Sequence, residues 1–264
     1  MGNNINNNIN WFPGHMAKSI KKLKEITKFI DFFFEIVDAR APVSSRGDNF
    51  AKIIDFKPRI IVLNKSDLAD EKITNNWLSY FKNLNIFAIK SSKNSSLNLK
   101  SQINNLINKL EIKKKFGKIR CAVIGVPNVG KSCFINRLLG NKKLKVENKA
   151  GVTRSLNWVS CGNLEICDTP GILAPKINSE FAKKISYLGL VKSEILNTEE
   201  IVLNLIADLS YNYKKSPEEF LKDFAISNGC ISKGGEINLE RASNLFLKNF
   251  QTGKLGKISL EAPN

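Results

Sequence analysis

Residues 125–132 read GVPNVGKS, and this stretch decides the fold. It matches the pattern G-x4-G-K-[ST], follows an apolar run at 119–124 that predicts a strand, and precedes a predicted helix. In such a loop the glycines let successive backbone N–H groups point at phosphates, and the start of the helix adds a partial positive charge. We therefore predict a nucleotide site in which Lys131 bridges the β- and γ-phosphates and the Ser132 hydroxyl holds Mg²⁺.

A second segment typical of nucleotide hydrolases, DTPG at 168–171, follows the apolar run 164–167. In this D-x-x-G pattern we expect Asp168 to contact Mg²⁺ through water and the Gly171 N–H to meet the γ-phosphate. Between the two motifs, Thr153 is the candidate for a second hydroxyl on Mg²⁺, released when the γ-phosphate leaves. The alternative for Thr153 is an ordinary loop threonine.

The motif NKSD at 64–67 follows the apolar run 59–63 and predicts which base is bound. Guanine presents two donors side by side, N1–H and the exocyclic amino group. A carboxylate accepts from both, so Asp67 would select guanine and reject adenine. We expect Asn64 to brace the loop and the stem of Lys65 to cover one face of the base.

A third loop, SSK at 91–93, follows the apolar run 86–89 and fits the segment whose backbone binds the guanine oxygen. Together these loops give the predicted site. The predicted GTP-binding residues are Asn64, Lys65, Asp67, Ser91, Ser92, Asn128, Val129, Gly130, Lys131, Ser132, Cys133, Thr153 and Gly171.

The order of these motifs is unusual, because the base-binding loops precede the phosphate loop. In ordinary GTPases the phosphate loop comes first, so circular permutation, with the old termini joined through 113–118, is the simplest account. Apolar runs alternate with helical stretches around 47–55, 70–83 and 97–112, which is typical of a parallel sheet wrapped by helices. The predicted fold class is α/β: a circularly permuted P-loop GTPase domain with a mostly parallel sheet, plus a small C-terminal helical domain.

Beyond the D-x-x-G segment the pattern becomes helical, with a capping box at 216–219 and a helix at 239–250. An amphipathic basic helix is expected at 16–30, a hairpin at 156–167, and a loop with an extended tail at the C-terminal end. We predict three regions: a flexible arm at 1–9, a GTPase domain at 10–175, and a helical domain at 176–264.

The chain carries a formal charge of +17, nearly all of it in residues 1–175, which hold 29 basic and 13 acidic residues. Such a field favours polyanions, nucleic acid first and anionic membrane second, although a lysine-rich composition is an alternative explanation. No run of 18 apolar residues occurs, so we expect no stable membrane association. Five cysteines without a CxxC pair favour a reducing, cytoplasmic location.

The motif order, together with NWFPGHMAK at 10–18, DARAP at 38–42, SSR at 44–46 and DTPGIL at 168–173, closely resembles the bacterial ribosome biogenesis GTPase A family. The resemblance covers residues 10 to about 260. It implies a GTPase of large ribosomal subunit assembly, with an RNA-contacting helical domain and hydrolysis stimulated by the maturing subunit. The implied partners are GTP or GDP and the rRNA and proteins of the large-subunit precursor.

Two further residues are predicted to serve hydrolysis. Many GTPases place a glutamine after D-x-x-G to orient water, but Ile172 cannot do so, and the only histidine, His15, is the catalytic candidate in a loop shaped by Pro13 and Gly14. Asn128 is the candidate ligand for K⁺, as in potassium-activated GTPases. The alternatives are a structural histidine and an asparagine that only shapes its loop.

Two other functions remain open at this point. One is a GTPase in another RNA-related or membrane-associated process, for which no modification domain or lipid anchor is evident. The other is a non-hydrolysing RNA-binding scaffold, which the complete set of phosphate and metal residues disfavours.

Overall fold

The computed structural model describes residues 14–46, 54, 57–93, 96–112, 117–140, 157–171, 179–191, 197–209 and 215–263. Its described part contains a six-stranded sheet in the order β3-β2-β1-β4-β6-β5, in which only the β5–β6 pair is antiparallel. The predicted, mostly parallel sheet is therefore confirmed. The strands are β1 (Phe32–Asp38), β2 (Arg59–Asn64), β3 (Phe87–Ser91), β4 (Ile119–Ile124), β5 (Asn157–Cys161) and β6 (Leu164–Asp168).

The central strands are covered on both faces, which is why they read as continuous apolar runs. In β1, Phe33 belongs to the cluster that includes Leu23 and Ile26 on one face. Its neighbour Phe34 points the other way and meets Phe134 edge to face, with ring centroids 5.2 Å apart. A parallel sheet needs this two-sided cover, because its crossover helices lie on the faces.

Helices around the sheet lie close to their predicted ranges: α1 (Gly14–Thr27), α3 (Glu71–Asn83), α4 (Ser96–Lys109) and α5 (Lys131–Leu139). The predicted helix at 47–55 falls almost wholly outside the described residues. One expectation is wrong: Gly14 and His15 form the first turn of α1, not a separately shaped loop. The amphipathic pattern of α1 is confirmed in its C-terminal half, where Leu23 and Ile26 are buried.

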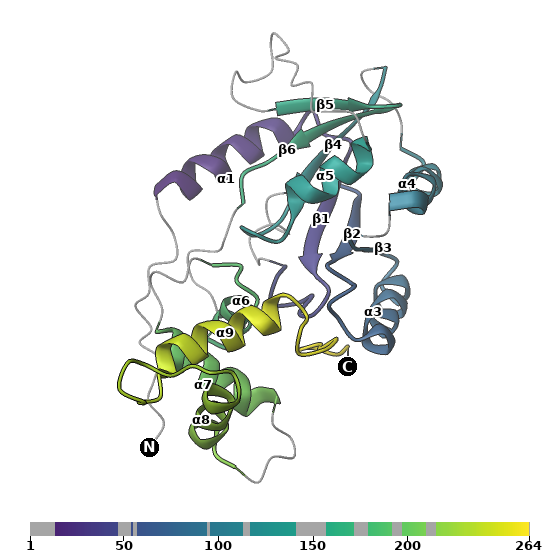
Figure 1. Ribbon diagram of the computed structural model, residues 1–264. Helices are drawn as coiled ribbons and strands as arrows, with labels where there is room; N and C mark the ends of the chain where they lie inside the picture. Colours follow the sequence, from purple (N-terminus) through teal and green to yellow (C-terminus); the bar gives the residue numbers. More distant parts are fainter. Residues whose placement is uncertain are drawn as a thin grey trace.

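Among the described residues, four helices follow the sheet: α6 (Ser179–Tyr187), α7 (Thr198–Leu209), α8 (Pro217–Ser227) and α9 (Leu239–Gln251). The predicted capping box is present, since Glu219 N donates to Ser216 Oγ and Ser216 N donates to Glu219 Oε2. Helix α6 was not expected from the sequence. We call α6–α9 the helical module, and Figure 1 shows it beyond the end of the sheet toward which β1 points.

The C-terminal tail, residues 253–263, has no helix or strand and returns to the part of the chain that holds the sheet. Leu260 N donates to Arg40 O at 2.7 Å, and Ile258 N donates to Leu68 O at 3.1 Å. The Glu261 carboxylate accepts from the Ser44 hydroxyl and, at 2.7 Å, from the backbone N–H of Val43. The tail thus ties the helical module to the loops that follow β1 and β2.

Over the described residues, no helix is both long and apolar enough to cross a membrane. All five cysteines are free thiols.

Candidate nucleotide site

The phosphate loop lies between β4 and α5, and its backbone can adopt its shape only with glycine at two positions. Gly125 has φ +155°, and a Cβ added there would lie 2.6 Å from Ile36 O. Gly130 has φ +101°, and a Cβ there would collide with the Asn64 side chain. The loop is therefore pressed against β1 on one side and against the base-binding loop on the other.

Lys131 begins α5 with its amine folded back over the loop. Nζ donates to the backbone oxygens of Gly125 at 3.1 Å and Val126 at 2.9 Å. Burial lowers the pKa of Lys131 to about 8, although the nearby Asp168 charge acts in the opposite direction. A largely buried ammonium at the start of a helix suits an anionic ligand, because phosphate oxygens would supply counter-charge and further hydrogen-bond acceptors.

Ser132 and Asp168 meet at the end of β6. Ser132 Oγ donates to Asp168 Oδ2 at 3.1 Å, while the buried Asp168 Oδ1 has no hydrogen-bond partner among the described residues. Burial raises the pKa of Asp168, and the Ser132 hydrogen bond partly offsets that rise. A hydroxyl and a partnerless carboxylate oxygen are the oxygen ligands that Mg²⁺ takes, so these residues fit the ion. Thr153, the third predicted ligand, lies outside the described residues.

Gly171, the last residue of the D-x-x-G segment, packs closely against the phosphate loop. A Cβ on Gly171 would lie 2.7 Å from Pro127 Cα and 3.1 Å from Lys131 Nζ. The D-x-x-G segment therefore touches the phosphate loop directly.

The base-binding loop is joined to the phosphate loop through Asn64. Its Nδ2 donates to Val129 O at 2.8 Å, and its Oδ1 accepts from Arg137 Nη2 at 2.7 Å. Ser91 and Ser92 support the same loop through their backbone oxygens, which accept from Ser66 N and from the Arg137 guanidinium. The permuted chain thus brings its early and late motifs into contact.

A cavity of about 530 Å³ lies between these loops, within the size range of small-molecule sites. Part of its wall comes from the helical module, which no sequence motif indicated. The lining residues are Asn64, Lys65, Asp67, Leu68, Lys93, Gly130, Cys133, Asn136, Arg137, Leu188, Gly189, Gln251 and Thr252.

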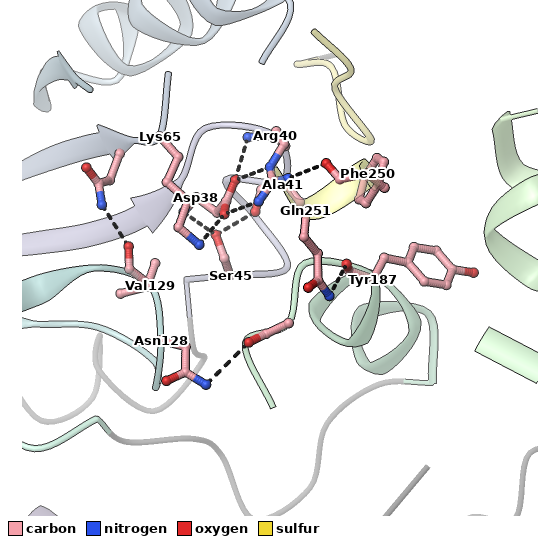
Figure 2. A network of polar contacts seen from close by, with 12 residues as sticks. Asp38, Arg40, Ala41, Ser45, Lys65, Asn128, Val129, Tyr187, Phe250 and Gln251 are labelled. Atoms are coloured by element: carbon pink, nitrogen blue, oxygen red, sulfur yellow. Dashed lines mark hydrogen bonds and ion pairs between the residues drawn. The ribbon is translucent and has the colours of Figure 1, made fainter. Parts of the chain in front are cut away.

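Asn128 turns toward the helical module instead of toward the base-binding loop. Its φ is +55°, and its Nδ2 donates to Gly189 O at 3.3 Å. Figure 2 shows the amide nitrogen directed at this carbonyl and the amide oxygen on the opposite side. The phosphate loop is therefore in direct contact with the turn that follows α6.

Asp38, at the end of β1, lies at the centre of a buried ion-pair cluster beside the site, and sequence reasoning assigned it no role. It is fully buried and accepts from Arg40 Nε and Nη2 at 2.9 Å each, and its Oδ2 lies 3.2 Å from Lys65 Nζ (Figure 2). Burial acts to raise the pKa of Asp38, but the Arg40 and Lys65 charges outweigh it, so the pKa is lowered. The sequence signal that could have indicated this cluster is the pair of charged residues, Asp38 and Arg40, at the end of a mostly apolar strand.

His15 is placed only in part. Its backbone lies in the first turn of α1, whereas its side chain lies outside the described residues, as do Ile172 and Leu173. No contact between His15 and the phosphate loop can be assigned from the described atoms.

A phosphate loop, a D-x-x-G segment packed against it and a guanine-type N-K-x-D loop, all at the carboxyl ends of the parallel strands, define a P-loop GTPase. A family profile described as "50S ribosome-binding GTPase" matches residues 120–228, which contain the first two of these motifs. The base-binding loop at 64–67 lies outside that range, in keeping with the permuted motif order.

Two curated relatives match almost the whole chain. Ribosome biogenesis GTPase A of Priestia megaterium is 36% identical over 280 residues, covering 97% of this chain and 97% of the relative. Its Thermotoga maritima counterpart is 35% identical, covering 97% of this chain and 95% of the relative. The chain belongs to the ribosome biogenesis GTPase A family, and it is a GTPase.

Solved structures agree with this assignment. A GDP-bound structure of YlqF matches with a TM-score of 0.73 and 32% identity, covering 92% of this chain and 99% of that one. A GNP-bound YlqF from T. maritima matches with the same TM-score and identity over 94% of this chain. The predicted fold class, a circularly permuted GTPase with a helical C-terminal part, is confirmed.

Proposed function

We propose that this GTPase acts late in the maturation of the large ribosomal subunit and that the subunit precursor stimulates its hydrolysis of GTP. The observation that carries the proposal is the whole-length match to relatives named for ribosome biogenesis. The charge of +17 supports it, because rRNA is a polyanion and the excess lies in residues 1–175. The helical region 176–264 would contact the particle, and the protein would act in the cytoplasm without stable membrane association.

In this proposal each motif has a separate task on GTP. Asp67 selects the guanine, Lys131 neutralises the phosphates, and the N–H groups of the phosphate loop hold their oxygens. Mg²⁺, held by Ser132, Asp168 and Thr153, would supply further positive charge at the β- and γ-phosphates when bound. Loss of the γ-phosphate releases Thr153 and the Gly171 segment, which lies against Pro127.

Sedimentation of cell extract tests the ribosomal assignment. With a non-hydrolysable GTP analogue the protein should co-sediment with large-subunit particles, and with GDP it should move to the top of the gradient. Absence from the large-subunit fraction with either nucleotide would reject the assignment. Co-sedimentation with another RNA or with membranes would favour the alternative, a GTPase switch in another process.

For hydrolysis, we propose His15 as the catalytic residue that orients the attacking water, because Ile172 cannot form a hydrogen bond with it. His15→Ala should bind GTP and the particle nearly as well as the wild type but lose most particle-stimulated turnover. Single-turnover hydrolysis with saturating large subunits measures this. A rate within about threefold of the wild type, roughly 0.65 kcal/mol in barrier, would reject the role.

We also propose that Asn128 Oδ1 binds K⁺ beside the phosphates. The hydrogen bond from its Nδ2 to Gly189 O supports this, since it fixes the amide with the oxygen turned away from the helical module. Turnover should be faster in KCl than in NaCl at equal ionic strength, and Asn128→Ala should remove the difference. Equal rates in the two salts for the wild-type protein would contradict K⁺ binding.

A further inference from the structure

The base-side cavity is only partly enclosed by the base-binding loops. Its lining continues onto the helical module, at Leu188 and Gly189 after α6 and at Gln251 and Thr252 at the end of α9. Asp67, the predicted guanine-binding residue, lines the same cavity. A ligand that fills this space therefore touches two parts of the protein that are distant in sequence.

The end of α9 is held against the GTPase part by a buried arginine. Arg40 Nη1 donates to Phe250 O at 3.4 Å, and the guanidinium lies over the Phe250 ring, 5.4 Å from its centroid (Figure 2). The same guanidinium forms an ion pair with Asp38. The Asp38 carboxylate also forms an ion pair with Lys65 of the base-binding loop. One carboxylate thus connects the base-binding loop to the last turn of α9.

Within the module, Gln251 joins the ends of α9 and α6. Its Nε2 donates to Tyr187 O at 3.1 Å. The fit against Gly189 is tight, because a Cβ on Gly189 would lie 2.9 Å from Gln251 Nε2. This packing fixes the Gln251 amide at the cavity wall.

We propose that Gln251 and Thr252 are nucleotide-contacting residues, so that the docked helical module forms one wall of the nucleotide site and slows nucleotide release. Asp38 and Arg40 are the positioning pair that keeps the end of α9 in place. The inference rests on the proposed binding of GTP in this cavity. Because binding and docking are linked, the nucleotide also stabilises the docked module by the same free energy.

The rate of nucleotide release from the full-length chain tests the wall directly. Fluorescent GDP should dissociate about tenfold faster from Gln251→Ala and several-fold faster from Thr252→Ala than from the wild type. Arg241→Ala, an exposed position in the first turn of α9, is the matched control and should stay within twofold. Release from both cavity variants at the wild-type rate would overturn the proposal.

Hydrogen exchange with and without GDP provides a second readout, because contact with the nucleotide adds protection that depends on GDP. GDP should protect the amides of residues 250–253 in the wild type, and the protection should fall in Gln251→Ala. Equal exchange with and without GDP at this end of α9 would contradict contact with the nucleotide.

The role of Arg40 is tested by combining variants. Arg40→Lys keeps the charge but loses the paired donors to Asp38, so GDP should leave several-fold faster. If Arg40 acts through the end of α9, adding Gln251→Ala should increase the rate little beyond the larger single effect. Independent, multiplicative effects would contradict the positioning role.

Asp67→Asn separates this inference from the proposed function. If Asp67→Asn weakens GDP binding and the Gln251 and Thr252 variants do not, the guanine site stands and the module is not its wall. If none of the three changes GDP binding, the cavity is not the nucleotide site and both ideas fail.

Discussion

The phosphate side and the base side of the candidate nucleotide site are built in different ways. The residues of the phosphate side come from one stretch, 119–171, which holds β4, the loop, α5 and β6 and the contacts of Lys131 and Ser132. The base side combines the end of β1, the loop after β2, α5 and the end of α9. A short motif can define the first side, whereas the second exists only once distant segments have packed together.

The chemistry of the two sides also differs. The phosphate side relies on glycine backbone and on a lysine whose pKa is lowered to about 8 mainly by burial. The base side depends on a buried carboxylate with a lowered pKa, held by two cations. We therefore expect substitutions on the base side to change stability and domain docking, and substitutions on the phosphate side to change chemistry alone.

The largest effect is expected from Asp38→Asn. Removing this charge leaves Arg40 buried without its partner, so the free energy of unfolding should fall by about 3–5 kcal/mol. Chemical denaturation measures the loss. Asp223→Asn, which removes the exposed ion pair with Lys215, is the matched control and should change the unfolding midpoint little. Similar losses for Asp38→Asn and Asp223→Asn would contradict the stabilising role assigned to the buried Asp38–Arg40 pair.

An intermediate effect is expected from Asp67→Asn, now on affinity. An amide brings its own donor to the guanine edge, and two charge-assisted hydrogen bonds are lost, so GTP affinity should fall by about 2–3 kcal/mol. Xanthosine triphosphate, which presents an acceptor where guanine has its amino group, should bind more tightly than it does to the wild type. Titration of the variant and the wild type with both nucleotides measures this change in base preference. Unchanged GTP affinity would show that Asp67 does not select the base.

The smallest effect is expected from Glu261→Gln in the C-terminal tail. The amide weakens the charge-assisted bonds to Ser44 and Val43, so stability should fall by about 1–2 kcal/mol. Release of GDP should become slightly faster, because the tail also holds Leu68 beside the cavity. Glu240→Gln, on the exposed side of α9, is the control. A loss of stability in Glu240→Gln as large as that in Glu261→Gln would contradict a specific role of the tail carboxylate.

Sequence patterns predicted the phosphate side well for a physical reason. The phosphate loop requires glycines with positive φ, a strand before them and a helix after them. Each of these features depends on neighbouring residues, so a short sequence motif can predict them. Strands β1, β2 and β4 were predictable for a similar reason, since burial on both faces leaves a continuous apolar run.

The base side was predicted only as far as its motifs reach. The burial of Arg40 depends on Phe250, more than two hundred residues later, and no local pattern records that contact. Helix α6 was also missed, although Phe181 and Ile185 have the spacing of one helical face. Its nine residues are too short for periodicity to decide, and packing against α7 and α9 stabilises it.

The C-terminal tail also sets the order in which the site is completed during synthesis. Ile258 and Leu260, which bind the backbone at Leu68 and Arg40, are translated long after the base-binding loop. At about 5–20 residues per second, roughly 10–40 s separate the appearance of Asp67 from that of Glu261. A nascent chain therefore carries its N-K-x-D loop before the last turn of α9 and the tail exist to pack against it. With the role proposed for Gln251 and Thr252, slow release of nucleotide would begin only once this end of α9 has been made.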